Sequence, residues 1–165
     1  MSFFSPAKAN LFFRVVGKRE DGYHEIASLF QTITLGDILR IEPAKVDSFI
    51  CNDPQIASDN IVVRARDLFR QKSGIYQPVK IELEKAIPIQ AGLGGGSSNA
   101  ATALWAMNQI TDKTVDVKQL QAWGAELGSD VPLFFSKGTA YCTGRGEIIR
   151  ELTPLRSRRF ASVEA

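Results

Sequence analysis

Glycine residues crowd one segment of the chain, which then changes to helical spacing. Four of them fall within five positions of IPIQAGLGGGSSNAATALWAMNQI (residues 87–110), at Gly92 and at 94–96. Glycine permits positive φ angles and leaves room for a ligand beside the backbone. The first turn of a helix presents unpaired N–H groups and roughly half a positive charge. This order of residues therefore predicts an anion-binding loop, and phosphate is the expected anion.

The loop differs from two common phosphate-binding patterns. A Walker A loop needs lysine followed by serine or threonine, whereas Ser98 and Asn99 stand there. The GxGxxG pattern also fails, because Ser97 or Asn99 occupies its last position. We expect Ser97 and Ser98 to cap the following helix, with hydroxyl groups within reach of phosphate or a metal ion. The alternative is a tight turn before a capped helix, so the loop alone does not define a reaction.

A lysine and an aspartate supply candidate chemistry elsewhere in the chain. Lys8 and Asn10 share one face of an alternating apolar segment; the alternative is a lysine at a sheet edge that extends into solvent. Asp130 follows a predicted helix end and precedes the apolar residues 131–135, which we expect to begin a strand. An aspartate at such a place otherwise forms a turn or a cap.

Two further groups lie in polar, turn-rich segments. Tyr23 and His24 offer a flat aromatic ring and a hydrogen-bonding partner for a base, or they are ordinary surface residues. Gly144 and Gly146 flank Arg145, which suits a hairpin turn or a second backbone contact to a ligand.

Both strands and helices must position these residues. The pair Asp59-Asn60 and the residue Asp116 are predicted to cap helices, and Gly128 is a predicted helix stop. A turn is expected at Gly36 and Asp37. The order of elements predicts an α+β fold rather than a regular βαβ alternation. The predicted strands cover 7–16, 28–35, 38–44, 47–52, 79–84 and two segments within 131–152, and the predicted helices cover 61–72, 100–110 and 117–127.

The composition excludes several classes of protein. The 165 residues include 20 basic and 18 acidic ones, and a net charge of +2 is too balanced for a nucleic-acid-binding protein. Cys51 and Cys142 lack CxxC spacing and His24 is the only histidine, so we expect reduced thiols and no histidine-rich metal cluster. No apolar run approaches the roughly 20 residues of a membrane span. We expect a cytoplasmic protein with neither a membrane nor a nucleic acid as partner.

Six segments, in this order, resemble the GHMP kinase superfamily: SPAKANLFF, GKREDGYHEI, DNIVVRA, PIQAGLGGGSSNAATAL, LGSDVPLFF and GTAYCTGRGE. The resemblance runs from about Ser5 to Glu151. It implies an α+β N-terminal kinase domain, with a mixed or antiparallel sheet packed against helices and a left-handed βαβ crossover at the phosphate loop. It also implies that residues 1–155 form this domain and that 156–165 begin a connection to a C-terminal lobe that this chain lacks.

The resemblance further implies an activity. With Mg²⁺ present, ATP would give its γ-phosphoryl group to the 2-hydroxyl of a small-molecule substrate, a cytidyl diphosphate sugar alcohol of the non-mevalonate isoprenoid pathway. Lys8 and Asp130 match the catalytic pair, and Asn10, Tyr23 and His24 match residues near the substrate, the last two around its cytosine. The residues that the resemblance assigns to ATP are Asn60, Lys85, Pro88, Ile89, Gln90, Ala91, Gly92, Leu93, Gly94, Gly95, Gly96, Ser97 and Ser98.

Some points stay open. Another GHMP small-molecule kinase and a non-catalytic nucleotide-binding fragment are the alternatives, and neither the metal ligands nor the oligomeric state follow from the sequence. Two positions depart from the family pattern: Ala9 stands where leucine is usual, and Gln90 where glycine is common. We expect Ala9 to affect packing only, and Gln90 to alter the conformation of the loop.

Overall fold

The computed structural model describes residues 1–56, 58–146 and 148–153. Helices and strands are mixed along the chain, so the predicted α+β class is confirmed. The predicted boundary at residue 155 and the predicted connection 156–165 lie outside the described residues. None of the described helices is long and apolar enough to cross a membrane. The elements are β1 (Ser2–Lys18), β2 (His24–Pro43), β3 (Ser48–Cys51), α1 (Ile61–Ser73), β4 (Val79–Glu84), α2 (Gly95–Ile110), α3 (Val117–Leu127), the 3₁₀ helix η1 (Val131–Phe135), β5 (Thr139–Thr143) and β6 (Ile148–Glu151).

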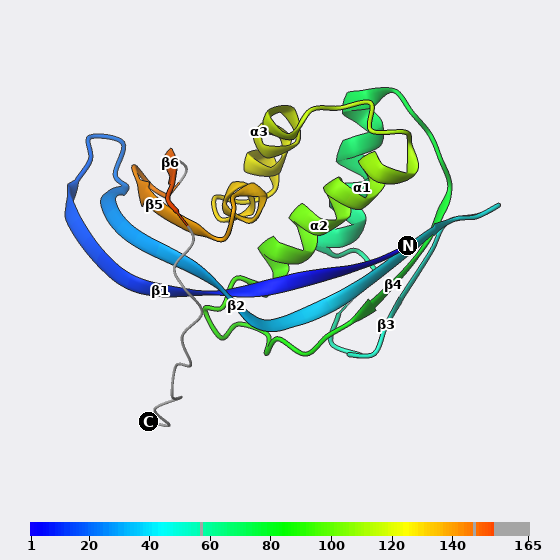
Figure 1. Ribbon diagram of the computed structural model, residues 1–165, viewed down its shortest axis with the longest axis horizontal. Helices are drawn as coiled ribbons and strands as arrows, with labels where there is room; N and C mark the ends of the chain where they lie inside the picture. Colours follow the sequence, from blue (N-terminus) through cyan, green and yellow to red (C-terminus); the bar gives the residue numbers. More distant parts are fainter. Residues whose placement is uncertain (57, 147, 154–165) are drawn as a thin grey trace.

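The sheet is organised around β2. β1 pairs antiparallel with β2 along nearly its whole length, and Figure 1 shows the two as a long, curved hairpin in blue and cyan. β4 and β5 pair with two successive parts of the opposite edge of β2, also antiparallel. β3 runs parallel to β4 and is joined to it through α1. The mixed sheet is thus confirmed, and the left-handed βαβ crossover expected at the phosphate loop, which follows β4, stays a prediction.

The core lies between the sheet and the helices, which cover one face of it (Figure 1). α2 contacts β1, β2, α1 and α3, and its alanines let it pack closely against these neighbours. Leu39 and Ile81 of the sheet, Leu104 of α2 and Phe69 of α1 are all fully buried. The burial of apolar surface in this layer holds α2 in place, and it contributes about 25 cal/mol of stability per Å² buried.

The predicted ends of α1 and α3 are confirmed. Oδ1 of Asn60 accepts hydrogen bonds from the amides of Val62 and Val63, at 2.9 and 3.2 Å. Asp116 caps α3 in the same way, and Gly128 follows the last residue of that helix. A polar side chain that satisfies first-turn amides stabilises a helix by about 1 kcal/mol.

The predicted turn at Gly36 and Asp37 is wrong, because β2 continues through both residues. Gly36 lies opposite Pro6 of β1, and a Cβ atom on Gly36 would stand 2.4 Å from Cζ of Phe4. Glycine therefore makes room here for an aromatic ring that covers the strand. Asp37 is fully buried instead of lying in a solvated turn.

The start of α2 also differs from the prediction. The helix begins at Gly95 rather than Ala100, and Gly94 takes the N-cap position with a left-handed φ of 69°. Ser97 and Ser98 lie inside the first turn, so the prediction that they cap the helix is wrong, and no side chain caps it. Position 95 has no room for a larger residue, since a Cβ atom on Gly95 would stand 2.9 Å from Cγ2 of Ile87.

The apolar segment after Asp130 is likewise not a strand. Val131–Phe135 forms the 3₁₀ helix η1. Pro132 lacks an N–H group for a sheet ladder but is tolerated in the first turn of a helix. The hairpin predicted around Arg145 does form, between β5 and β6.

Candidate active site

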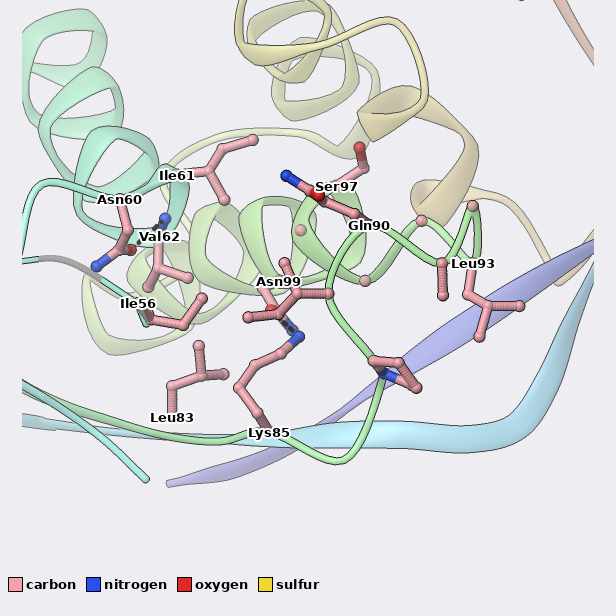
Figure 2. A pocket seen from close by; sticks show the side chains of 17 residues that line it. Ile56, Asn60, Ile61, Val62, Leu83, Lys85, Gln90, Leu93, Ser97 and Asn99 are labelled. Carbon is pink, nitrogen blue, oxygen red and sulfur yellow. Dashed lines mark hydrogen bonds between the residues drawn. The ribbon is translucent and has the colours of Figure 1, made fainter. Parts of the chain in front are cut away.

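The glycine-rich loop encloses a pocket of about 340 Å³ between the end of β4 and the start of α2. Figure 2 shows Ile56, Asn60 and Leu83 at one end of it, and Gln90, Leu93 and Ser97 at the other. Every residue that the resemblance assigned to ATP contributes to the lining except Ser98, which is buried beneath the loop. Their role in binding ATP stays a prediction. The lining residues are Ile56, Asn60, Ile61, Val62, Leu83, Lys85, Pro88, Ile89, Gln90, Ala91, Gly92, Leu93, Gly94, Gly95, Gly96, Ser97 and Asn99.

The loop takes its shape from three left-handed residues. Gly92 and Gly94 have φ angles of 72° and 69°, which glycine adopts without a steric penalty. Gln90 has a φ of 59°, where a side chain costs about 1 to 2 kcal/mol. At position 90, where glycine is common in the family pattern, the backbone therefore has the conformation that favours glycine.

The helix end supplies hydrogen-bond donors to the pocket. The first helical bond of α2 runs from the Ser98 amide to the Gly94 carbonyl, at 2.9 Å. The amides of Gly95, Gly96 and Ser97 precede that bond, and these are the groups that a helix N-terminus leaves for an anion. The first turn of α2 contains no acidic residue that would repel one.

Lys8, Asn10 and Asp130 come together beside the loop. The ammonium of Lys8 donates to Oδ1 of Asn10 at 2.9 Å and lies 3.6 Å from Oδ2 of Asp130. The Lys8 side chain is 8% exposed, so it is not a lysine that reaches into solvent, whereas that of Asp130 is 34% exposed. The prediction that Lys8 and Asn10 point the same way is confirmed. The fold also brings together Lys8 and Asp130, which are far apart in the sequence.

Three contacts fix Lys8 in this position. Its backbone amide donates to the carbonyl of Leu93 in the loop, at 2.9 Å. Its ammonium lies 4.8 Å from the centre of the Phe30 ring, a cation–π contact. The loop residue Gly94 packs against its side chain, since a Cβ atom there would stand 2.9 Å from Lys8 Cγ. The lysine and the loop therefore hold a fixed relative position.

Asp130 stands before the first residue of η1, but its carboxylate caps no helix. The carboxylate is thus available to Lys8 and to a bound molecule. The charge of Asp130 also affects Cys142. Burial, and to a smaller extent the Asp130 charge, raise the pKa of the Cys142 thiol to about 11. This cysteine is therefore a neutral part of the core behind the carboxylate.

Tyr23 and His24 lie at the far end of the β1–β2 hairpin, where His24 pairs with Lys18. Both are exposed, and the Arg145 guanidinium lies 4.8 Å from the centre of the Tyr23 ring. The β5–β6 turn that carries Arg145 connects this end to the catalytic candidates. Its Gly144 amide bonds to Glu25, and a Cβ atom on Gly146 would lie 4.0 Å from Asp130.

Lys85 has structural partners that the sequence did not reveal, whereas Asn60 has the capping role that the sequence predicted. The Lys85 ammonium forms an ion pair with Asp37 and donates to Oδ1 of Asn99 at 3.1 Å, as Figure 2 shows for Asn99. Asn60 caps α1. Sequence reasoning missed Asp37, because a Gly-Asp pair is typical of a turn. The available signal was a set of small polar residues, Ser5 and Asn99 among them, in apolar surroundings.

Comparisons with known proteins identify the type of domain. Residues 60–138 match the family model for the N-terminal domain of GHMP kinases. This match agrees with the GHMP kinase N-terminal domain that the resemblance predicted. A solved structure of 4-(cytidine 5'-diphospho)-2C-methyl-D-erythritol kinase is similar over 92% of this chain and 55% of its own, with a TM-score of 0.81 and 40% identity.

Curated relatives make the likeness more specific. The 4-diphosphocytidyl-2-C-methyl-D-erythritol kinase of Protochlamydia amoebophila (strain UWE25) is 56% identical over 154 residues, which are 92% of this chain and 54% of that protein. The chloroplastic enzyme of the same name from Mentha piperita is 50% identical over 159 residues, 93% of this chain and 39% of that protein. The chain thus spans about half, or less, of the length of these relatives.

Proposed function

We propose that this chain is the ATP-binding part of a kinase that phosphorylates the 2-hydroxyl group of 4-diphosphocytidyl-2-C-methyl-D-erythritol, in the non-mevalonate pathway of isoprenoid synthesis. The names of the relatives support this substrate. The observation that carries the reaction is the packing of Lys8 against the glycine-rich loop. It holds a cation, with a carboxylate 3.6 Å from it, beside a loop suited to phosphate.

The pocket suits ATP in its chemistry. Ile56, Ile61 and Leu83 give one end an apolar lining for a purine ring. Gly94, Gly95 and the rest of the loop give the other end exposed backbone and helix amides for phosphates. The apolar end adjoins Asn60, and the phosphate end adjoins Lys8. This polarity agrees with adenine at the first end and the transferable phosphate at the second.

The catalytic roles follow from charge and position. Asp130 accepts the proton of the substrate hydroxyl as that oxygen attacks phosphorus. Lys8 favours the ionised carboxylate and stabilises negative charge on the transferring group. ATP, when bound, supplies the γ-phosphoryl group, and the bond from this group to the bridging oxygen breaks so that ADP leaves. Phosphoryl transfer depends mostly on positioning and charge neutralisation, and the loop, α2 and Lys8 provide both.

Mg²⁺ would depend largely on phosphate oxygens. The described residues contain no cluster of three or more histidine, cysteine, aspartate or glutamate side chains that would bind a metal by themselves. Mg²⁺ in kinases usually takes one or two protein oxygens and several from phosphate and water. Ser97 offers such an oxygen in the first turn of α2, where it lines the pocket.

Tyr23, His24 and Asn10 form the proposed substrate side. Tyr23 stacks on the cytosine through its exposed face, and His24 reads the polar edge of the base. Asn10, which already accepts from Lys8, lies near the hydroxyl to be phosphorylated. The cytoplasmic location and the absence of nucleic-acid and membrane partners also stay predictions.

A substrate panel tests the proposal. We expect ATP-dependent phosphorylation of the cytidyl substrate. The kcat/KM for mevalonate or homoserine should be at least about 100-fold lower than that for the cytidyl substrate. Preference for mevalonate or homoserine would refute the substrate. Calorimetry with a non-hydrolysable ATP analogue separates the remaining alternative, because binding without turnover would mark this chain as a nucleotide-binding fragment.

A further inference from the structure

We propose that Asp37 is a positioning residue that fastens both ends of the phosphate loop to each other and to the strand that carries Lys8. The proposed function supplies the identity of the ligand, ATP. The hydrogen bonds of Asp37 supply the rest. Its carboxylate is fully buried, and it lies inside β2 rather than in the pocket.

Asp37 holds the residues that enter the loop. Its Oδ1 atom accepts hydrogen bonds from the backbone amides of Ala86 and Ile87, at 2.7 and 2.8 Å. These residues lie between the end of β4 and Pro88, the first residue of the loop. Bonds from amides to a carboxylate are stronger than bonds between neutral groups, and at a fully buried carboxylate water does not replace them.

Asp37 also joins Lys85, which precedes the loop, to Asn99, which follows it. Its Oδ2 atom accepts from the Lys85 ammonium and from Nδ2 of Asn99, the latter at 2.8 Å. Asn99 lies in the first turns of α2, and its Oδ1 accepts in turn from Lys85. A single carboxylate therefore bonds to residues on both sides of the glycine-rich segment. The span of the loop is set by these bonds and not by the glycines, which have no side chains to set it.

The same network reaches the strand of Lys8. Asn99 donates to the hydroxyl of Ser5 at 3.0 Å, and that hydroxyl also bonds to Ser98 and Thr102 of α2, at 2.9 and 3.1 Å. Ser5 is fully buried in β1, the strand of Lys8. The network thus fixes the position of the loop relative to the Lys8 ammonium. Loss of Asp37 would leave the buried Lys85 ammonium, 7% exposed, without its counter-ion.

Asp37→Asn tests this role, with Asp47→Asn as the matched control. Asparagine keeps the shape of Asp37 but turns a donor toward Lys85 and Asn99. Asp47 also accepts from a backbone amide, that of Val79, and from a cationic side chain, Arg70, but none of these residues lines the pocket. The control therefore removes a carboxylate with the same kinds of hydrogen-bond partner, just before β3, without touching the loop.

Two measurements on the full chain distinguish the variants. We expect Asp37→Asn to speed hydrogen exchange of the amides of residues 86–87 and 89–98 by about 10-fold or more, and Asp47→Asn to leave them within about threefold. Calorimetry should show about 10-fold weaker binding of a non-hydrolysable ATP analogue to Asp37→Asn only, well below the melting temperature of both variants. Unchanged exchange in Asp37→Asn, or equal loss of affinity in both variants, would overturn the proposal.

The hydrogen-exchange measurement tests the role of Asp37 independently of the proposed function. If the unsubstituted chain fails to bind the ATP analogue, the proposed function fails, while the exchange rates still decide the role of Asp37. If Asp37→Asn does not fold, Asn99→Ala decides, because it removes the helix side of the network and keeps the ion pair with Lys85. We then expect faster exchange at the start of α2 with Ala86 and Ile87 still protected. Uniform protection in Asn99→Ala would contradict the proposal.

Discussion

Gly94 lies directly against the side chain of Lys8. A Cβ atom on Gly94 would stand 2.9 Å from Cγ and 3.3 Å from Cε of the lysine. Distances under about 3.4 Å are shorter than an ordinary van der Waals contact between carbon atoms. The absence of a side chain at position 94 is therefore what lets the phosphate loop approach the lysine ammonium.

The first prediction compares Gly94→Ala with Gly92→Ala. Both glycines have left-handed φ angles near 70°, but a Cβ atom on Gly92 would meet nothing within 4 Å. We expect Gly92→Ala to cost about 1 kcal/mol of unfolding free energy from backbone strain alone. Gly94→Ala should cost about 1 kcal/mol more and weaken ATP binding by about 10-fold, because Lys8 must move. Urea unfolding and calorimetry measure both; equal losses in the two variants would contradict the contact.

The second prediction concerns the proposed proton acceptor. Asp130→Asn should lower kcat by about 10²- to 10⁴-fold, since the amide cannot accept the hydroxyl proton. Affinity for ATP should change by less than about threefold, because Asp130 does not line the nucleotide pocket. Steady-state kinetics and calorimetry check the two halves. Near-normal turnover would remove Asp130 as the acceptor.

The third prediction concerns Lys8. Lys8→Met keeps an unbranched side chain under Gly94 and against Phe30 but removes the ammonium. We expect a loss of about 10²-fold or more in kcat/KM, with a change in unfolding free energy below about 1.5 kcal/mol. Thermal melting beside kinetics makes the comparison. A variant that merely unfolds would indicate that the buried lysine serves the fold.

The fourth prediction is a dependence of stability on pH. Hydrogen bonds from Arg70 lower the pKa of Asp47 from 3.8 to about 2, against the opposing effect of burial. A carboxyl whose pKa is lowered by folding adds stability above its unfolded pKa and loses it as the pH falls through the folded pKa. The loss should thus occur between pH 4 and 2. Its size should be about 1 kcal/mol, reduced by solvent because the Asp47 side chain is 34% exposed.

Asp47→Asn provides the comparison for that measurement. Urea unfolding of the two proteins at pH 6 and pH 3 should give a difference that shrinks at the lower pH. A constant difference would show that the ion pair with Arg70 contributes nothing that depends on the charge of Asp47.

The fifth prediction separates the two cysteines. Because burial and the Asp130 charge raise the pKa of Cys142 to about 11, its thiol should resist iodoacetamide at pH 8 in the folded protein. Cys51 is partly exposed and should react. Mass spectrometry of alkylated peptides, with and without urea, reports both sites. Modification of Cys142 at the rate of Cys51 without denaturant would contradict the packing around it.

Much of the local structure could be predicted from the sequence. The caps at Asn60 and Asp116 form as predicted, because a cap depends on residues two or three positions away. The alternation in β4 likewise depends on neighbours along the strand, whereas register shifts interrupt the alternation predicted for residues 7–16 of β1. The glycine loop was recognisable because its residue types limit the backbone directly.

Local signals were wrong where distant side chains decided the outcome. The Gly-Asp pair at 36–37 has the composition of a turn, but the ring of Phe4 and the buried donors around Asp37 keep it within a strand. The apolar residues after Asp130 suggested a strand, but they form a 3₁₀ helix with a proline in its first turn. The first turn of α2 similarly includes two glycines that propensity alone would exclude.

The sequence by itself determined the family likeness, the phosphate loop and the residue types that chemistry would need. Only the tertiary structure brought Lys8 close to Asp130 and placed Gly94 against that lysine. It also brought Asp37 and Lys85 together as an ion pair. These contacts join residues far apart in the chain, and they exist because the burial of apolar surface packs β1, β2 and α2 together. Sequence spacing limits which residues share a face, and packing decides which faces meet.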